Sequence, residues 1–153
     1  MNAVELLKAD HKVVAGLFEK VKTTPDADHQ SLFEQIKAEL DVHTHIEETI
    51  LYPKLKADGD KELVDITLEG IEEHRQVKMF LKELDALSGD SEKFEPKLKV
   101  LMEDVEHHVK EEEGEMFPMV KKQFEADVLD ELGAAMEAEK KSFQKTQTAG
   151  AGK

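Results

Sequence analysis

A histidine, a glutamate one helical turn later and an aromatic-proline pair occur twice in this chain, as His43-Thr-His-Ile-Glu47-Glu48-Thr-Ile-Leu-Tyr52-Pro53 and as His108-Val-Lys-Glu-Glu112-Glu113-Gly-Glu-Met-Phe117-Pro118. The second copy follows the first by 65 residues at every position. A shorter pattern, Asp10-His11 and then Glu73-His74, repeats at a separation of 63 residues. Two copies of one helical hairpin therefore follow one another, which predicts a bundle with internal twofold pseudo-symmetry.

The sequence around these copies has the spacing of amphipathic helices. Apolar residues recur at alternating steps of three and four along four segments, so each segment has one buried stripe. Turn-forming residues at Pro25, Gly59 and Gly89 separate the segments. The four predicted helices cover residues 2–24, 28–58, 61–87 and 91–122.

A fifth, weaker amphipathic segment follows the four long ones, between residues 124 and 145. The last residues, 146–153, are small, polar and glycine-containing, and we expect them to be disordered. The predicted fold is therefore all-α: an antiparallel up-down four-helix bundle made of two pseudo-repeated hairpins, plus a short C-terminal fifth helix. Residues 1–145 would form one domain.

The composition excludes several classes of function. The chain has 153 residues with a formal net charge of −14, and such an acidic surface repels phosphate backbones and anionic lipid headgroups. We therefore expect no nucleic-acid or membrane partner. Cysteine is absent, so any metal must be held by nitrogen and oxygen. The sequence has no apolar run as long as a signal peptide or a membrane span, which predicts a cytoplasmic protein.

The helical stripes carry six polar residues that point to a metal site. His43 and Glu47 lie one turn apart on the same face of a helix, and the second copy of the pattern repeats the arrangement. The first and third helices each add one histidine, so four imidazoles and two carboxylates converge on the bundle axis. Burying two unpaired carboxylates costs several kcal/mol or more, and a cation would remove that cost. The six residues are His11, His43, Glu47, His74, His108 and Glu112.

The donor types narrow the choice of metal. Imidazole and carboxylate without thiolate suit iron or manganese, with zinc and copper as further possibilities. Inward-facing glutamates and histidines in a bundle are typical of sites that hold two metal ions. Six side chains are few for two octahedral ions, so we expect coordination positions open to solvent or to a small ligand.

Other polar residues near the pattern have alternative roles. His29, His45 and His107 lie off the stripes, and we expect them at the surface. Glu48 and Glu113 are expected in solvent or as hydrogen-bond partners of the ligands rather than as ligands. Asp10 and Glu73 precede site histidines and either orient them or are ordinary surface charges. Lys78 either extends to solvent or reaches the open edge of the site, and Tyr52 either packs like Phe117 or hydrogen-bonds near the metal.

In these motifs the chain resembles the hemerythrin-like, or HHE cation-binding, family over residues 3 to 122. That family has a histidine on the first and third helices and a His-x-x-x-Glu pattern on the second and fourth. The resemblance implies a non-haem di-iron centre, two iron ions joined by an oxo or hydroxo bridge, with manganese or zinc less favoured. It also implies that both carboxylates bridge the metals. The implied ligands are His11, His43, Glu47, His74, His108 and Glu112.

The chain departs from the oxygen-carrying hemerythrins at two positions. Those proteins have a second histidine four residues after the one on the third helix, and this chain has Lys78 there. On the fourth helix the carriers have an aspartate five residues after the histidine, whereas this chain has Glu112 four residues after His108. Glu113 stands at the position that corresponds to the carriers' aspartate. Both differences weigh against reversible oxygen carriage and favour reaction with O2, NO or peroxide.

These patterns predict a di-iron protein that binds or senses a small oxidant such as O2, NO or peroxide. The same site is compatible with a peroxidase, catalase-like or NO-handling enzyme, so whether the protein turns over a substrate stays open. Iron storage or iron sensing is a second class, because metal loss would leave two buried carboxylates uncompensated. A structural or partner-binding bundle, docking through the fifth helix, is a third. We expect a monomer or a weak dimer.

Overall fold

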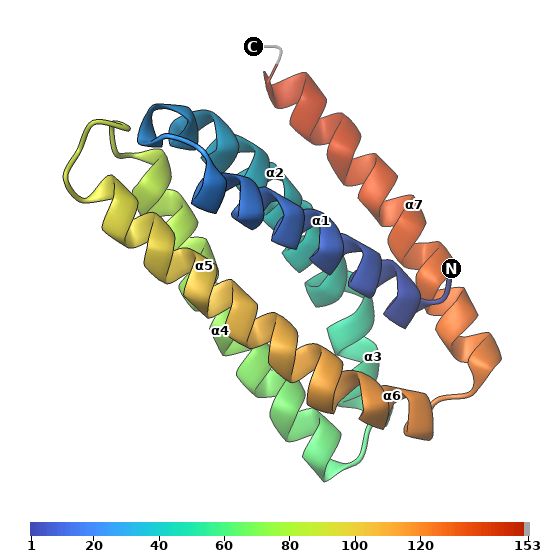
Figure 1. Ribbon diagram of the computed structural model, residues 1–153. Helices are drawn as coiled ribbons and strands as arrows, with labels where there is room; N and C mark the ends of the chain where they lie inside the picture. The colour runs from blue at the N-terminus through green and yellow to red at the C-terminus, as the bar shows by residue number, and fades with distance from the viewer. Residues whose placement is uncertain (152–153) are drawn as a thin grey trace.

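The computed structural model describes residues 1–151, with side chains through residue 148, and these residues form the predicted all-α bundle (Figure 1). Two long antiparallel hairpins lie side by side, and a last helix packs along one of them. None of the helices in the described part of the chain is long and apolar enough to cross a bilayer. The helices are α1 (Ala3–Thr23), α2 (His29–Ile46), α3 (Tyr52–Asp58), α4 (Lys61–Asp85), α5 (Phe94–Glu111), α6 (Phe117–Gln123) and α7 (Ala126–Ala151).

The first hairpin begins with a capping box that the sequence predicts. The Asn2 side chain accepts a hydrogen bond from the Glu5 amide at 2.9 Å, and the Glu5 carboxylate accepts one from the Asn2 amide. The second hairpin begins similarly at Asp60, whose carboxylate accepts a hydrogen bond from the Leu63 amide at 2.9 Å. These side chains satisfy backbone donors that helix starts otherwise leave free, which sets where each hairpin begins.

Each hairpin contains one π-helical turn, which the sequence pattern does not predict. The turn Glu47–Leu51 joins α2 to α3, and the Tyr52 amide donates to the carbonyl of Glu47 five residues earlier. Pro53 follows directly, and a proline within a helix lacks an amide hydrogen and collides with the carbonyl four residues before it. The turn Glu112–Met116, before Pro118, repeats the arrangement between α5 and α6. The wider turn accommodates the proline and rotates all later residues by about 100° relative to a continuous helix.

The apolar core has two parts separated by a polar layer. One part lies where α3, α6 and the start of α7 meet the beginning of α1 and contains residues such as Leu7, Leu55 and Met136. The other lies toward the opposite end of the bundle and contains residues such as Phe33 and Leu98. The histidines and glutamates of the repeated pattern lie between the two parts, so the core positions them from both sides.

Helix α7 is longer than the sequence predicts. It lies along α1 and α2 and continues to Ala151, through most of the segment 146–153 that we expected to be disordered (Figure 1). The Gln147 amide donates to the carbonyl of Ala38 on α2 at 3.0 Å, a tertiary contact that the local composition does not reveal. Residues 152–153 lie outside the described part of the chain.

A close backbone contact between α7 and α1 generates a stability prediction. A Cβ atom at Gly133 would lie 2.7 Å from the carbonyl carbon of Asn2 and 2.9 Å from the amide nitrogen of Ala3. Because backbone cannot move aside cheaply, we expect Gly133→Ala to lower the free energy of unfolding by about 1–3 kcal/mol in urea denaturation. Gly16→Ala is the control, since that exposed glycine has nothing within 4 Å of the new atom and the change should stabilise by up to about 1 kcal/mol. Equal stability of the Gly133 variant and the wild type would contradict the prediction.

Candidate metal centre

The structure brings together all six residues that the sequence predicts as ligands, in the polar layer between the two parts of the core. Each histidine comes from a different helix of the bundle, and each glutamate is the first residue of a π-helical turn. All six side chains are buried, and Glu47 is completely inaccessible to solvent. The group consists of His11 on α1, His43 and Glu47 from the first copy of the pattern, His74 on α4, and His108 and Glu112 from the second copy.

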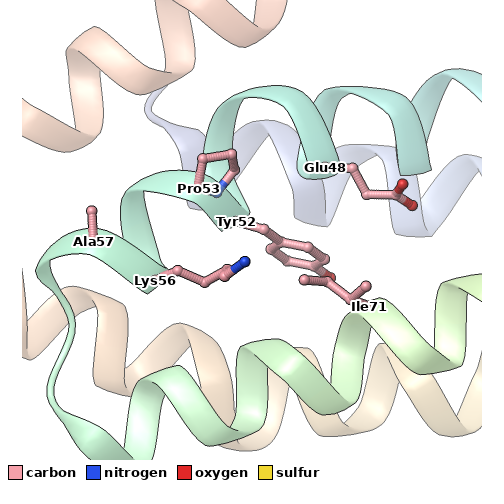
Figure 2. A pocket seen from close by; sticks show the side chains of 6 residues that line it. All are labelled: Glu48, Tyr52, Pro53, Lys56, Ala57 and Ile71. Carbon is pink, nitrogen blue, oxygen red and sulfur yellow. The ribbon is translucent and has the colours of Figure 1, made fainter.

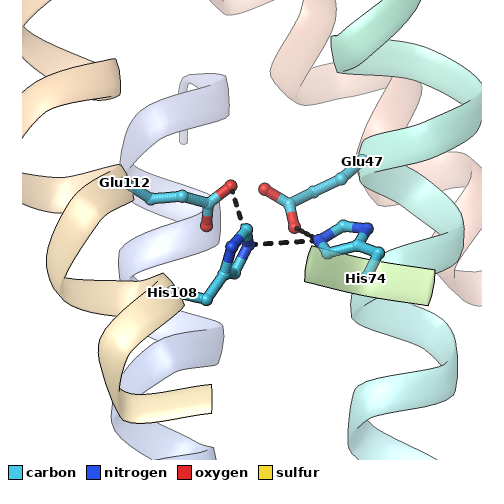
Figure 3. A group of neighbouring side chains, drawn as sticks. All are labelled: Glu47, His74, His108 and Glu112. Atoms are coloured by element: carbon cyan, nitrogen blue, oxygen red, sulfur yellow. Dashed lines mark hydrogen bonds and ion pairs between the residues drawn. The ribbon is translucent and has the colours of Figure 1, made fainter. Parts of the chain in front are cut away.

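The six residues form two donor groups that share one carboxylate. Glu47, His74, His108 and Glu112 point toward one another in Figure 3, and each offers a ligand atom within 4.8 Å of the others. In a second group, His11 and His43 of the first hairpin and again Glu112 offer ligand atoms that lie within 4.8 Å of one another. Two cations in these positions would therefore have Glu112 between them.

Both carboxylates face imidazoles from different helices. Glu112 places Oε1 at 3.1 Å from Nε2 of His11 and Oε2 at 3.5 Å from Nε2 of His108. Glu47 places Oε1 at 3.0 Å from Nε2 of His43 and 3.1 Å from Nε2 of His74. The inward nitrogens of all four histidines thus surround two carboxylates, as the pseudo-symmetry of the sequence predicts.

Several of these buried atoms have no hydrogen bond in the described residues. Both carboxylate oxygens of Glu47 and Nε2 of His43 are inaccessible to water and have no aligned partner. His43 Nε2 lies close to Glu47 Oε1, but the two atoms point past one another rather than along a hydrogen bond. Buried polar groups are almost always hydrogen-bonded, and a charged one left alone is costly. The donors therefore fit a cation placed between them.

The outward nitrogen of every site histidine is bound by a second carboxylate. Metal-binding histidines normally have such a partner, because it fixes the ring and directs the other nitrogen toward the metal. Asp10 and Glu73, which the sequence left open as surface charges, have this role, and so do Glu48 and Glu113. The four Nδ1 contacts are His11 with Glu113 at 2.6 Å, His74 with Glu48 at 2.8 Å, His43 with Asp10 at 3.1 Å and His108 with Glu73 at 2.6 Å.

Proton distribution balances the charge of the metal-free centre. Burial by itself lowers the pKa of His43, but the charge of Glu47 and the hydrogen bond with Asp10 outweigh it and raise that pKa to about 10. Burial by itself raises the pKa of Glu112, but the charge of His108 and further hydrogen bonds hold it well below its ordinary value. Without metal, protonated imidazoles therefore neutralise the buried carboxylates. A cation would take the place of these protons, so its binding should release them.

Tyr52 lies in the centre, where the sequence left its role open between packing and hydrogen bonding. Its hydroxyl donates to Glu112 Oε2 at 2.7 Å and lies 3.3 Å from Nε2 of His74. Burial and the charge of Glu112 raise the pKa of Tyr52 well above its ordinary value, so the phenol keeps its proton. Gly70 leaves room for this hydroxyl, because a Cβ there would lie 3.3 Å from it. The sequence gives no direct signal for this contact, because it depends on the rotation introduced by the π-helical turn.

The two copies of the repeated pattern differ at the position of Tyr52. Phe117, the counterpart of Tyr52, stacks on His11 with ring centroids 5.9 Å apart and an angle of 5° between the planes. The Tyr52 ring lies against His74 with centroids 5.2 Å apart. The two halves of the centre therefore have similar aromatic walls, but only the half with His74 has a hydroxyl.

The three histidines predicted at the surface have different surroundings. That prediction is wrong for His29, which is only 5% exposed and pairs with Glu95 of α5 through Nδ1 at 2.7 Å. The turn after α1 brings it there, and sequence spacing does not describe turns. His45 is partly covered by α7, where Glu139 binds its Nε2 at 2.8 Å. His107 is exposed, as predicted.

Lys78 binds a carboxylate outside the donor group. Its Nζ lies 2.6 Å from Glu48 Oε1, and Glu48 in turn holds His74. The side chain is about half exposed, so it extends toward solvent and still acts on a site histidine through one intermediate residue. Lys78 thus belongs to the surroundings of the site.

Two hollows border the centre. A surface pocket of about 530 Å³ lies between α3 and α4, with the Tyr52 ring and Lys56 on the α3 side and Ile71 on the α4 side (Figure 2). A much smaller cavity of about 20 Å³ lies inside the bundle, against the rings of the four site histidines. Its remaining wall is almost wholly apolar and consists of Val14, Leu40, Thr44, Val77, Val105 and Val109.

Comparison with known protein families shows to which family the chain belongs. Residues 2–120 match the family described as the Hemerythrin HHE cation binding domain. The chain belongs to this family. The match covers both hairpins and therefore every residue of the donor group, and it agrees with the resemblance that the sequence motifs indicate.

Known proteins similar to this HHE domain include one solved structure of the same family. The crystal structure of a hemerythrin HHE cation binding domain-containing protein from Mycobacterium kansasii superposes with a TM-score of 0.80 at 31% identity, covering 95% of this chain and 89% of that one. An uncharacterized protein of Mycobacterium tuberculosis is 34% identical over 90% of this chain and 84% of its own length. A DNA nickase of Nostoc sp. is 27% identical over 99% of this chain, which spans only 44% of that relative.

The hydroxyl of Tyr52 gives a prediction for the metal-free HHE domain. Tyr52→Phe removes a donor from the buried Glu112 carboxylate and leaves the aromatic wall in place. We expect the free energy of unfolding of the metal-free protein to fall by about 1–3 kcal/mol in urea denaturation. Tyr52→Leu, which also removes the ring, should cost more. A Phe variant as stable as the wild type would show that the hydrogen bond contributes nothing.

Proposed function

We propose that this HHE domain is a non-haem di-iron protein that binds or senses a small oxidant, O2, NO or peroxide. The observation that carries the proposal is the pair of donor groups sharing Glu112, in which Nε2 of His43 and both oxygens of Glu47 are buried without a hydrogen bond in the described residues. Oxygen and nitrogen donors without thiolate favour iron over softer alternatives such as Cu(I). Two ions held about one carboxylate are also what an inward-facing Glu/His pattern in a bundle is known to support.

In this proposal the donor groups divide the work between two ions. His74 and His108 would hold one, and His11 and His43 would hold the other. Both carboxylates would be shared, as the family resemblance implies, because Glu112 belongs to both groups and Glu47 Oε1 lies close to Nε2 of both His43 and His74. Bound iron would supply redox chemistry and a coordination position for a small molecule. The carboxylates on the outward nitrogens would keep each imidazole turned toward the ion, and the protonated hydroxyl of Tyr52 lies 2.7 Å from Glu112 Oε2.

The internal cavity supports a ligand of two or three atoms. At about 20 Å³ it has room for little more than one water molecule, and it borders all four site histidines. Its valine and leucine wall offers few hydrogen bonds, which favours an apolar molecule such as O2 or NO over a larger or more polar substrate. The cavity therefore favours small-oxidant binding over turnover of an organic substrate inside the bundle.

Two other functions of the same centre lead to different observations. A peroxidase, catalase-like or NO-handling enzyme would consume excess H2O2 or NO faster than free iron does, and the proton on Tyr52 favours this alternative. Iron storage or sensing would require the bundle to loosen when metal leaves, because both oxygens of Glu47 then have no aligned hydrogen-bond partner among the described residues. The Nostoc relative is named a DNA nickase, but the net charge of −14 opposes DNA binding, and we propose no nucleic-acid partner for this chain.

Anaerobic loading with ferrous iron tests the ligand assignment. We expect two irons per chain and a higher melting temperature than in chelator-treated protein, because the metal replaces protons on buried donors. His74→Ala and Glu47→Ala should retain one iron or none when bound metal is counted. His107→Ala is the matched control, since this exposed imidazole is next to His108 in sequence and should leave two irons in place. Full iron content in both ligand variants would refute the assignment.

Admitting O2 to the loaded protein tests what the centre does. Because Lys78 stands where oxygen carriers have a further histidine, we expect the visible spectrum to change on oxidation and not to return when O2 is swept away. Excess H2O2 and NO, added separately, then show whether either is consumed. A band that appears and disappears reversibly would instead indicate oxygen carriage.

A further inference from the structure

Helix α7 reaches the metal centre through a lysine. Lys140 Nζ lies 2.5 Å from Oδ1 of Asp10 on α1, and the other oxygen of Asp10 lies 3.1 Å from Nδ1 of His43. Asp10 is only 4% exposed and Lys140 is 25% exposed, so this contact is largely shielded from water. A residue of the last helix is therefore two contacts away from a proposed iron ligand.

Further contacts hold α7 beside the same ligand. Glu139 binds His45 at 2.8 Å, and the ring of Phe143 stacks on His45 with centroids 4.5 Å apart. His45 is two residues from His43 on α2. The segment 139–143 therefore contacts both α1 and α2 close to His43, through Asp10 on α1 and His45 on α2. Figure 1 shows α7 running along this hairpin. The position of Lys140 thus depends on the docking of the helix.

The other half of the centre is built differently. Glu73 occupies the place of Asp10 and binds Nδ1 of His108 at 2.6 Å. Its side chain is 27% exposed and faces Glu111 and His107 on the surface of α5. Solvent can compensate the charge of Glu73, whereas Asp10 is buried and its charge is compensated by Lys140. The pseudo-symmetry of the hairpins is therefore broken by α7.

The two oxygens of Asp10 have different partners, Lys140 on Oδ1 and Nδ1 of His43 on Oδ2. Lys140 holds one oxygen of Asp10 and so keeps the other against Nδ1 of His43, which turns Nε2 of that ring toward the position of the cation. Without the lysine, Asp10 loses the contact that holds its carboxylate in this orientation, and the His43 ring loses its fixed position. We propose that Lys140 is a positioning residue for the His11 and His43 half of the metal centre, so that docking of α7 and metal binding in that half stabilise each other.

This inference rests on the proposed function and adds a regulatory connection to it. Coupling between two events is reciprocal, so metal in this half must hold α7 more firmly by the same factor as docked α7 tightens the metal. Whatever displaces the segment 139–143 would then weaken one of the two metal positions and spare the other.

Metal titration of the full chain tests the role of Lys140. Lys140→Met removes the charge and keeps the aliphatic length, and competition with a chelator under anaerobic conditions gives the affinity for each of two ferrous ions. We expect one of the two affinities to fall roughly 10- to 100-fold, as for other partners of metal-bound histidines. Lys141→Met is the matched control, because Lys141 is 72% exposed and its one ion pair among the described residues is with Glu137 of the same helix. Lys140→Arg should restore most of the affinity.

A double variant separates positioning from general stability. If Lys140 acts through Asp10, then adding Lys140→Met to Asp10→Asn should cause little further loss of affinity. Equal loss at both positions, an equal effect of Lys141→Met, or wild-type affinity in Lys140→Met would each overturn the proposal. Wild-type protein that binds no stoichiometric iron would instead refute the proposed function.

Hydrogen exchange on the wild type tests the coupling without any variant. Loading with ferrous iron should slow amide exchange in residues 136–143 of α7 by at least several-fold relative to the metal-free protein. Exchange in residues 94–98 at the start of α5, far along the bundle from the centre, serves as the internal reference. Unchanged exchange in 136–143 while iron is bound would overturn the reciprocal coupling.

Discussion

Two carboxylates in the middle of a four-helix bundle are the constraint on which the rest of the structure depends. Glu47 and Glu112 are almost entirely buried, and a charge there must be met by opposite charge or by a metal. The surrounding residues form layers in which basic and acidic side chains alternate, so that each charge has an opposite charge beside it. Imidazoles face the inner carboxylates, further carboxylates face the outer side of each imidazole, and Lys78 and Lys140 neutralise two of these outer carboxylates. Going from the bundle axis to solvent, each charged layer is thus compensated by the layer outside it.

The prolines of the repeated pattern contribute to this arrangement as much as its charged residues do. Each one follows a π-helical turn that begins at a buried glutamate and makes room for the proline ring. The turn changes the direction of the following residues, which places Tyr52 and Phe117 against site histidines. A feature that costs backbone regularity therefore closes the centre on one side with two aromatic rings. Its occurrence at both copies indicates that it belongs to the hairpin unit.

Two hollows of very different size border the centre. Inside the bundle, the cavity against the four imidazoles is narrow and apolar. Outside, the larger pocket between α3 and α4 is divided from the centre by the Tyr52 ring. The two halves of the centre have different neighbours: the half with His74 has the Tyr52 hydroxyl, and the half with His43 has Lys140 of α7 beyond Asp10. Two metal positions built from one repeated pattern would therefore have different chemical properties.

The sequence by itself determined the bundle, its internal repeat and the six residues of the centre, because helical periodicity fixes which side chains share a face. His43 with Glu47, and His108 with Glu112, are local relations within one helix. Tertiary structure alone decided the partners of these residues. Lys140 and Asp10 are 130 residues apart, and no periodicity relates them. The burial of His29, the hydroxyl of Tyr52 beside Glu112 and the length of α7 likewise depend on how helices pack and turn, since those contacts join faces that a one-dimensional pattern cannot place in space.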